Sequence, residues 1–230
     1  MSKVLIIAPT SQVKNYCIDE YVSNIRAMKV DFKICDNTLN NANGELYKAM
    51  NLDVLHVDPL SKTAIQYVTE SQNKLRDYFL KNDYTHLLSI ESDLLPPVYI
   101  VDKLLAHRKG VVSAPYFTHT NSSARLMVQE MSTMNATFGQ FRSIPIMDSF
   151  LSMDSGLKQV GCMGLGCTLI EREIVEAIPF RCTPDERTQN EAFADSFFAS
   201  DLARAGVAAW LDTSITITHL NQNWLTTRIN

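Results

Sequence analysis

The sequence contains no run of apolar residues close to the roughly 18 to 20 that a membrane-spanning helix requires. Its first residues, Met1-Ser2-Lys3, lead directly into a short apolar segment, which is too short and wrongly flanked for a secretory signal peptide. The net charge is −4 and no block of basic residues stands out, so nothing indicates binding to nucleic acid or to an anionic membrane. We therefore expect a cytoplasmic protein with no transmembrane segment.

Several common binding motifs are also missing. The five cysteines include no C-x-x-C pair, and their odd number leaves one over in any disulfide scheme, so we expect reduced structural thiols. No G-x-G-x-x-G follows the first apolar segment and no Walker A motif occurs anywhere, so neither a dinucleotide-binding fold nor a P-loop kinase is predicted.

What the sequence does contain is enough apolar material, 46% of 230 residues, for one large domain or two small lobes that share a core. In the first half, short apolar segments alternate with segments of helical periodicity. This alternation predicts an α/β fold with a mainly parallel sheet, helices on both faces, and ligands bound beyond the carboxyl ends of the strands. The expected strands cover 3–8, 31–35, 53–57 and 87–90, and the expected helices cover 15–28, 45–50 and 61–81, the last capped by Ser61.

The second half is less regular. Between residues 118 and 154 the periodicity is lost, which is typical of a functional lid or binding segment but equally of irregular structure. Both interpretations remain open. The other expected elements are helices over 98–107 and from 187 to 205, and strands over 111–116, 160–170, 207–211 and 214–220.

The segment Glu91-Ser92-Asp93 follows an apolar strand and precedes Pro96-Pro97. If the strand continues, alternation of side chains places Glu91 and Asp93 on one face. Two carboxylates on one face are suited to Mg²⁺ or Mn²⁺, which often keep further positions for substrate phosphate. The segment thus predicts a metal-bound diphosphate; the alternative is a solvated polar turn after a buried strand.

Polar residues follow the other expected strands as well. Thr10 and Ser11 follow the first, and Asp36 follows the second, where a carboxylate commonly binds a ribose or a base edge. Near the C-terminus, His219 shares a strand face with Ile215 and Ile217, so its imidazole needs a polar partner. That partner is a bound cation or a structural group of the protein.

Asp195 begins a helical pattern, and Phe198, Ala199 and Leu202 follow it on the same face. This spacing places the carboxylate on the apolar side of the helix, where desolvation makes it a stronger proton acceptor; the alternative is a helix N-cap. The glycines around Gly164-Leu165-Gly166 allow the backbone to approach a ligand closely, or else form a bulge.

Together these segments resemble the GT-A glycosyltransferases, especially family 2-like members. The motifs that carry the resemblance are Asn73 and Arg76, Glu91-Ser92-Asp93, Pro96-Pro97, Gly164-Leu165-Gly166-Cys167, Ala194-Asp195-Ser196-Phe197-Phe198, Gly206, Asp212 and His219. They extend over nearly the whole chain and are weakest between 118 and 154.

The resemblance implies a glycosyltransferase that moves a sugar from a nucleotide-diphosphate donor to a hydroxyl acceptor. Glu91, Asp93 and His219 would hold Mn²⁺ or Mg²⁺ on the diphosphate, and Asp195 would be the base of an inverting reaction. The family has a D-x-D where this chain has Glu91-Ser92-Asp93, and an E-D pair where it has Ala194-Asp195. The first departure affects metal geometry and the second removes a fallback base.

The resemblance also divides the single domain into a nucleotide- and metal-binding half, 1–97, and an acceptor-binding and catalytic half, 98–230. The residues expected to contact the sugar or the acceptor are Gly164, Leu165 and Gly166. The residues expected to contact the donor nucleotide are Ala8, Pro9, Thr10, Asp36, Asn73, Arg76, Glu91 and Ser92.

Family frequency favours a UDP-sugar over a GDP-sugar, and the acceptor class stays open among glycans, lipid-linked sugars, proteins and modified nucleic-acid bases. A sugar-1-phosphate nucleotidyltransferase is the alternative enzyme, but it normally has a glycine-rich loop with arginine after the first strand, and Ala8-Pro9-Thr10-Ser11-Gln12 has neither residue. A non-catalytic protein that binds nucleotide sugars or glycans is the alternative of another class.

Overall fold

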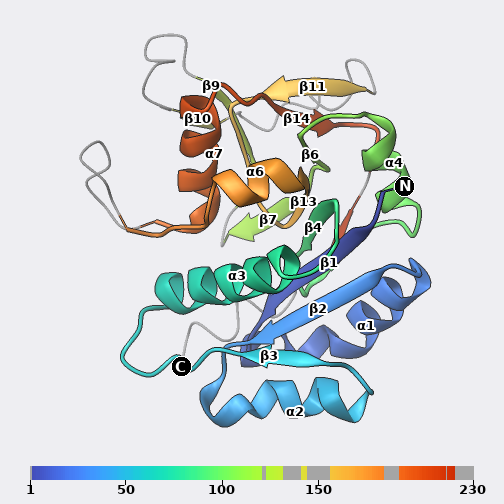
Figure 1. The fold of residues 1–230 in the computed structure, drawn as a ribbon, viewed down its shortest axis with the longest axis vertical. Coiled ribbons are helices and arrows are strands. Elements are labelled where there is room, and N and C mark those ends of the chain that lie inside the picture. Colours follow the sequence, from blue (N-terminus) through green and yellow to red (C-terminus); the bar gives the residue numbers. More distant parts are fainter. Residues whose placement is uncertain are drawn as a thin grey trace.

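The computed structural model describes residues 2–120, 123–131, 141–143, 156–183, 192–215 and 217–220. One eight-stranded sheet, in the order β11-β14-β6-β13-β4-β1-β2-β3, crosses the whole molecule (Figure 1). Strands from both halves of the chain therefore share one sheet. Within the described ranges, no helix has the length and apolar character needed to cross a membrane.

The first half follows the predicted alternation. β1, β2, β3 and β4 pair in parallel, and helices connect them. The strands are β1 (Val4–Thr10), β2 (Asp31–Asp36), β3 (Val54–His56) and β4 (His86–Ile90). The helices are η1 (Gln12–Cys17), α1 (Ile18–Ala27), η2 (Leu39–Asn41), α2 (Ala42–Ala49) and α3 (Ala64–Leu80).

The second half adds four strands of mixed direction. β13 (Cys167–Glu171) runs antiparallel between β4 and β6 (Val111–Ser113), whereas β14 (Ala209–Asp212) is parallel to β6. The edge strand β11 (Leu157–Val160) pairs antiparallel with β14. Four of the seven neighbouring pairs in this sheet are parallel, so the predicted mainly parallel α/β fold is confirmed. The helices of this half are α4 (Ile100–Ala106), α6 (Arg172–Ala177) and α7 (Ala194–Arg204).

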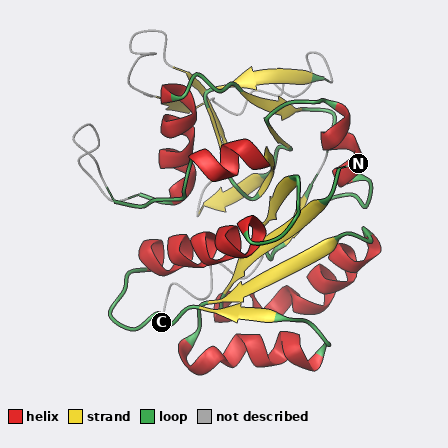
Figure 2. Ribbon diagram, viewed as in Figure 1, coloured by secondary structure: helices red, strands yellow, loops and turns green. Residues whose placement is uncertain are grey.

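Helices cover both faces of the sheet, as Figure 2 shows. Leu5 and Ile7 of β1 pack with Phe79 of α3, in a cluster that also includes residues of α6 and α7. Ile6, on the opposite face of the same strand, packs with Ile25 of α1, together with residues of α2 and α4. The alternation of side chains along a buried strand thus supplies two separate cores. All five cysteines are free and buried, as expected.

Short strands build a second layer at one end of the sheet. A hairpin pairs β7 (Phe117–Thr120) with β8 (Ser123–Leu126), and β5 (Leu94–Leu95) pairs with β15 (Thr218–His219). A three-stranded sheet contains β9 (Val128–Met131), β10 (Phe141–Ser143) and β12 (Cys162–Met163). The region without periodicity, 118–154, therefore contains regular strands; residues 121–122, 132–140 and 144–154 of it lie outside the described ranges.

Several predicted element bounds are wrong. The strand expected over 160–170 is two strands, β12 and β13, in different sheets. The helix expected from 187 begins at Ala194, and residues 184–191 are outside the described ranges.

Ser61 does not cap α3, because its φ of 61° belongs to a left-handed turn. Thr63 caps the helix instead, in a capping box with Gln66. The strand expected over 214–220 is short, because only Thr218–His219 pairs with β5; position 216 is outside the described residues.

The Asp212 side chain joins the end of β14 to α4, where Lys103 lies 3.9 Å away, and to His107 directly after that helix. The Asp212 carboxylate, which is 1% exposed, accepts hydrogen bonds from the Ser214 amide (2.9 Å) and from His107 Nε2 (2.7 Å). Burial alone would raise the pKa of Asp212, but the bonds from Ser214 and His107 bring it below its ordinary value of 3.8. The ionised carboxylate is therefore favoured by the fold.

We expect Asp212→Asn to lower the free energy of unfolding at pH 7 by about 1.5 to 3 kcal/mol, the cost of losing hydrogen bonds to a charged group. The contribution of a carboxylate with a lowered folded-state pKa is complete above its ordinary pKa and is lost as pH falls through the folded value. The difference between wild type and variant should therefore shrink below about pH 3.8. Urea unfolding of wild type and Asp212→Asn across a pH series measures this difference, and substitution of the exposed Asp102 by Asn is the control. A stability difference that does not change with pH would contradict the ionised state of Asp212 in the fold.

Candidate functional site

The segment Glu91-Ser92-Asp93 forms a tight turn directly after β4. The Glu91 amide donates to the Gly166 carbonyl (2.9 Å), and the Leu94 amide donates back to the Glu91 carbonyl (3.0 Å). The expected continuation of the strand through both acids is wrong, because the chain reverses here before β5. The turn nevertheless brings both carboxylates to one place, since oxygen atoms of Glu91 and Asp93 and a ring nitrogen of His219 all lie within 4.8 Å of one another.

Hydrogen bonds to β1, η1 and α1 hold this turn in place. The Ser92 hydroxyl donates to the Pro9 carbonyl at the end of β1 (3.3 Å), and the Cys17 thiol donates to the Ser92 carbonyl (3.3 Å). The Tyr21 hydroxyl of α1 donates to the carbonyl of Ile90 (3.1 Å). Because Cys17, Tyr21 and Ile90 are buried, the position of the acidic pair is set largely by the core.

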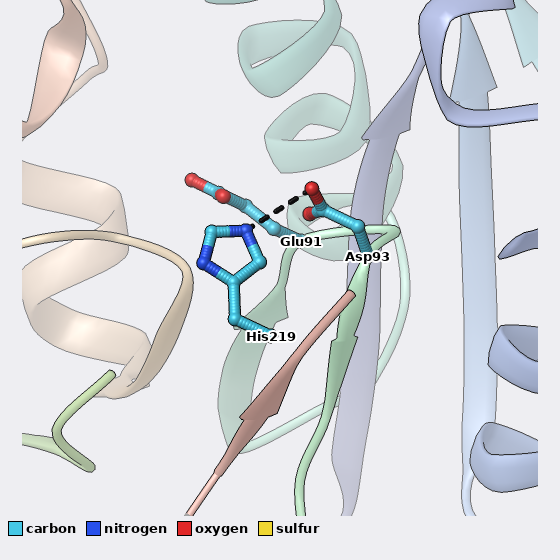
Figure 3. Close-up of side chains that lie close together, drawn as sticks. All are labelled: Glu91, Asp93 and His219. Carbon is cyan, nitrogen blue, oxygen red and sulfur yellow. Dashed lines mark hydrogen bonds and ion pairs between the residues drawn. The ribbon is translucent and has the colours of Figure 1, made fainter. Parts of the chain in front are cut away.

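His219 reaches the acidic pair through the pairing of β15 with β5. His219 lies opposite Leu94 in that pair, and the Leu220 amide donates to the Asp93 carbonyl (2.9 Å). Figure 3 shows the imidazole beside both carboxylates, with His219 Nε2 3.1 Å from Asp93 Oδ2. Two residues that are 126 positions apart are thereby held together by a two-residue strand pair.

Both ring nitrogens of His219 face oxygen atoms. Nδ1 lies 2.5 Å from the Phe117 carbonyl, and Nε2 lies against Asp93. A carbonyl and a carboxylate only accept hydrogen bonds, so this geometry favours the doubly protonated imidazolium. Burial alone would lower the pKa of His219, but the Asp93 carboxylate and the Phe117 carbonyl raise it above 6.5. The Phe117 carbonyl also fixes the tautomer in which Nε2 is the ligand atom for a metal.

Lys14 of η1 is the functional residue that the sequence did not reveal. Its ammonium forms an ion pair with Asp93 Oδ2, the same oxygen that His219 contacts. Burial alone would raise the pKa of Asp93, but His219 and Lys14 hold it below its ordinary value. The available signal was topological: Lys14 follows β1, whose parallel neighbour β4 ends at the acidic turn.

The cluster has the donor atoms that a divalent cation needs. Asp93 Oδ1 is buried with no hydrogen-bond partner, and no described residue hydrogen-bonds the Glu91 carboxylate. Burial, with a smaller contribution from Asp93, raises the pKa of Glu91 despite the nearby Lys14 ammonium. Two carboxylates and one imidazole suit Mn²⁺ or Mg²⁺, which accept oxygen ligands and leave positions for substrate and water. These residues therefore fit such an ion.

Glu91 and His219 of the cluster line a cleft of about 310 Å³, at the small end of the range for ligand sites, whereas Asp93 is fully buried. Asp195 lines the same cleft from the first turn of α7, and its Oδ1 accepts from the amide of Ser196 (2.8 Å). Phe193, not Asp195, is the N-cap of that helix. The lining residues are Pro9, Thr10, Ser11, Lys14, Asn37, Val68, Gln72, Ser89, Glu91, Ser92, Tyr116, Thr118, Met127, Leu165, Phe193, Ala194, Asp195 and His219.

At the β1–β2 end of the cleft, Asn37 rather than Asp36 forms the wall. Asp36 is fully buried, and its carboxylate accepts from the Thr38 amide (3.0 Å), the Thr38 hydroxyl (2.7 Å) and the Gly44 amide (2.9 Å). These bonds shape the entry to α2. Asn37 and Gln72 both line the cleft, and each has a buried amide oxygen with no hydrogen-bond partner.

Several other residues singled out in the sequence have structural partners. Ala8 lies in the core at 1% exposure. Asn73 exchanges two hydrogen bonds with the Phe180 backbone (2.7 and 3.1 Å), and Arg76 donates to the carbonyls of Val175 (2.7 Å) and Glu176 (3.0 Å). Neither Asn73 nor Arg76 lines the cleft. Both side chains attach α3 to α6 and to the residues that follow it. These bonds are structural, and they do not bring either residue to a nucleotide in the cleft.

The two glycines Gly164 and Gly166 make room for Tyr116. A Cβ atom on Gly164 would lie 2.1 Å from the Tyr116 hydroxyl oxygen, and one on Gly166 would lie 2.5 Å from the same ring. The Gly166 amide also donates to that hydroxyl (3.1 Å). Of the three residues expected at the sugar or acceptor, only Leu165 lines the cleft. The close approach allowed by these glycines is thus to a tyrosine of the protein.

No protein-family model matches the chain, and no curated protein matches it in sequence. Its fold is similar to several solved structures. A197 from STIV has a TM-score of 0.50 at 15% identity, over 94% of this chain and 85% of that one. A CMP:2-keto-3-deoxy-manno-octonic acid synthetase, solved with CTP, has a TM-score of 0.52 at 12% identity, over 91% of this chain and 89% of that one.

S. aureus TarS has a TM-score of 0.50 at 13% identity; the match covers 91% of this chain but 34% of TarS, so this chain spans about a third of that protein. At these identities the similarity establishes the fold and nothing of the activity. The mixed sheet with helices on both faces is a GT-A-like fold.

Proposed function

We propose that this protein is a metal-dependent glycosyltransferase that moves a sugar from a nucleotide-diphosphate donor to an acceptor hydroxyl. One observation carries the proposal: Glu91 and His219, which form a cluster with Asp93, line the same cleft as Asp195. A metal site suits the diphosphate of the donor, and a separate carboxylate suits the deprotonation of the acceptor. The donor is proposed to be a UDP-sugar, in preference to a GDP-sugar.

The residues of the chain divide the work between the two ends of the reaction. When bound, Mn²⁺ or Mg²⁺ supplies positive charge that stabilises the departing diphosphate. Asp195 accepts the proton of the acceptor hydroxyl as that oxygen forms a bond to the anomeric carbon and the bond to the diphosphate oxygen breaks. An attack opposite the leaving group inverts the configuration of the anomeric carbon. His219, held by the Phe117 carbonyl, keeps Nε2 directed at the metal position.

The donor nucleotide is proposed to lie along the end of β1, where Pro9, Thr10 and Ser11 line the cleft. Asn37 and Gln72 replace Asp36, Asn73 and Arg76 as its contacts, because their amide oxygens are buried without partners beside this space. A buried acceptor without a donor is costly, and an N–H or O–H group of the base or ribose would satisfy it.

The similarity to the CMP-sugar synthetase favours a second candidate, a nucleotidyltransferase. The two activities release different products: a glycosyltransferase releases a nucleoside diphosphate, whereas a nucleotidyltransferase consumes a nucleoside triphosphate and releases pyrophosphate. Incubation with Mn²⁺ and panels of UDP-sugars, GDP-sugars and nucleoside triphosphates, followed by assays for both products, tests the proposal. Pyrophosphate as the product would replace it with the second candidate.

Removal of the central carboxylate should abolish metal-dependent binding. In Asp93→Asn the oxygen shared by Lys14 and His219 loses its charge, and we expect Mn²⁺ to add nothing to the affinity for UDP. Isothermal titration of UDP with Mn²⁺ or with EDTA measures the effect, and the exposed Asp102→Asn is the control. If the affinity for UDP is changed neither by EDTA nor by Asp93→Asn, the metal site is excluded.

Asp195→Asn should separate chemistry from binding. The amide keeps the shape of the side chain but cannot take a proton, and general-base catalysis typically contributes ~10² to 10⁴ in rate. We expect turnover to fall at least about a hundredfold with donor affinity unchanged. Asp201→Asn is the matched control, because Asp201 lies on the same helix but pairs with Arg181 and Arg204. Near wild-type turnover in Asp195→Asn would require another base or a retaining mechanism.

Substitutions at the end of β2 should distinguish the two neighbouring residues. Asn37→Ala removes from the cleft an amide oxygen without a partner, and it loses only the long bond from Asn37 Nδ2 to the Ser71 hydroxyl (3.4 Å). We therefore expect UDP affinity to fall about two- to tenfold, as for one neutral hydrogen bond, with little loss of stability. Asp36→Asn breaks the bonds to Thr38 and Gly44 and should lower the melting temperature. Titration of UDP and thermal unfolding of both variants decide the matter; unchanged affinity in Asn37→Ala would place the base elsewhere.

A further inference from the structure

We propose that Lys14 is an exchangeable cation of the acidic cluster: it neutralises Asp93 while no metal is bound, and it moves to the donor diphosphate when a divalent ion takes Asp93. This inference rests on the proposed function, because it needs a metal and a diphosphate in the same cleft. It assigns to Lys14 a positioning role that no motif in the sequence indicates.

The first step of the argument is the position of the ammonium. Lys14 and His219 both contact Asp93 Oδ2, whereas Asp93 Oδ1 is buried without a partner. The side chains of Lys14 and Asp93 are 12% and 0% exposed, so the pair is poorly screened by solvent. A metal ion bound to this carboxylate would lie within a few ångströms of the ammonium. Two positive groups at that separation repel strongly, so the metal and Lys14 compete for Asp93.

The second step concerns what can move. The backbone of Lys14 is fixed, because its amide donates to the Ser11 carbonyl (2.9 Å) and its carbonyl accepts from the Cys17 thiol (3.2 Å). The side chain has four flexible carbons and ends in a compact charge. Displacement of the ammonium therefore requires a change of side-chain rotamer and no change in η1.

The third step is the destination. Lys14 lines the cleft together with Ser11 and Ser92, the residues between the end of β1 and the acidic turn. A metal that binds the donor diphosphate places phosphate oxygens in this same space, and lysine is a common phosphate ligand that acts as a point charge. The displaced ammonium thus exchanges one anionic partner for another.

This exchange predicts two effects of opposite sign. Without the Lys14 ammonium, His219 is the cationic partner that Asp93 keeps among the described residues. The carboxylate should therefore bind a metal ion more tightly. We expect Lys14→Gln to bind Mn²⁺ about tenfold more tightly than wild type when no nucleotide is present. In saturating Mn²⁺, the same variant should bind UDP about tenfold more weakly, because one charged contact with phosphate is lost.

The experiment measures free Mn²⁺ by electron paramagnetic resonance during titration of the protein, and UDP by calorimetry in saturating Mn²⁺. Lys14→Met repeats the test with the apolar stem retained, in case Lys14→Gln does not fold, and Lys14→Arg keeps the charge and should stay near wild type for Mn²⁺. Lys62→Gln is the matched control, since it removes the same charge from an ion pair with Glu70 outside the cleft.

Mn²⁺ affinity that is unchanged or weaker in Lys14→Gln and Lys14→Met would overturn competition for Asp93. Tighter Mn²⁺ binding with unchanged UDP affinity would overturn the transfer of Lys14 to phosphate. The proposed function fails separately: if the Mn²⁺ and UDP affinities change as expected but no sugar nucleotide is turned over, the exchange stands without the transferase. If a UDP-sugar is turned over but the affinity for Mn²⁺ is the same in wild type and in the Lys14 variants, only the proposed exchange of Lys14 is wrong.

Discussion

The buried carboxylate of Asp93 is the interaction on which the site depends. A fully buried anion is costly unless it is paired, and its partners come from segments far apart in the chain: Lys14 after β1 and His219 in β15. Neither β5 nor β15 has more than two residues, too few to stabilise a strand pair by themselves. The ion pair and the backbone bond from Leu220 to Asp93 therefore help to hold the C-terminal strand on the body of the fold.

The order of strands in the sheet explains the layout of the cleft. β4 lies beside β1 on one side and β13 on the other, so the turn after β4 is adjacent both to the end of β1 and to the loop before β13. The first neighbour supplies Lys14 and the polar residues Thr10 and Ser11. The second supplies Gly166, whose carbonyl receives the Glu91 amide. One turn thus connects the proposed nucleotide end of the cleft with the half of the chain that carries α7.

The sequence predicted the parts of this fold that depend on local pattern. In the first half, strands of alternating or continuous apolar character and helices with one buried face were found within a few residues of their predicted positions, because both signals are set by burial on one side of an element. The prediction of ligands beyond the carboxyl ends of the strands has another basis: in a mainly parallel sheet these ends meet at one edge. Ser61 and Thr63 show the limit of this reasoning: both are suitable caps, and only the left-handed backbone at Ser61 decides between them.

Long-range partners could not be predicted in this way. Asn73 and Arg76 were expected at the nucleotide, yet their donors bind backbone carbonyls about a hundred residues later in the chain, and periodicity says nothing of such contacts. Asp36 and Asn37 are adjacent, and on a strand end the choice of which side chain faces the cleft depends on the loop that follows. The Thr38 and Gly44 amides donate hydrogen bonds to the Asp36 carboxylate and hold it in the loop, so Asn37 is the residue that lines the cleft.

The chemistry of the nucleophile separates the two candidate activities more clearly than the fold does. A sugar 1-phosphate attacks a nucleoside triphosphate through an oxygen that is already anionic, so it needs no base, and a carboxylate beside its path would repel it. A nucleotidyltransferase that joins a nucleotide to a sugar hydroxyl has a neutral nucleophile instead, as a glycosyltransferase has. A hydroxyl acceptor is neutral and needs a proton acceptor. Asp195 lines the cleft beside Glu91, and its charge is among those that raise the pKa of that carboxyl. A carboxylate kept in this position despite the repulsion from its acidic neighbours is consistent with a neutral acceptor. It therefore counts against a nucleotidyltransferase that uses a sugar 1-phosphate, whereas one that uses a sugar hydroxyl is separated from the transferase by the product it releases.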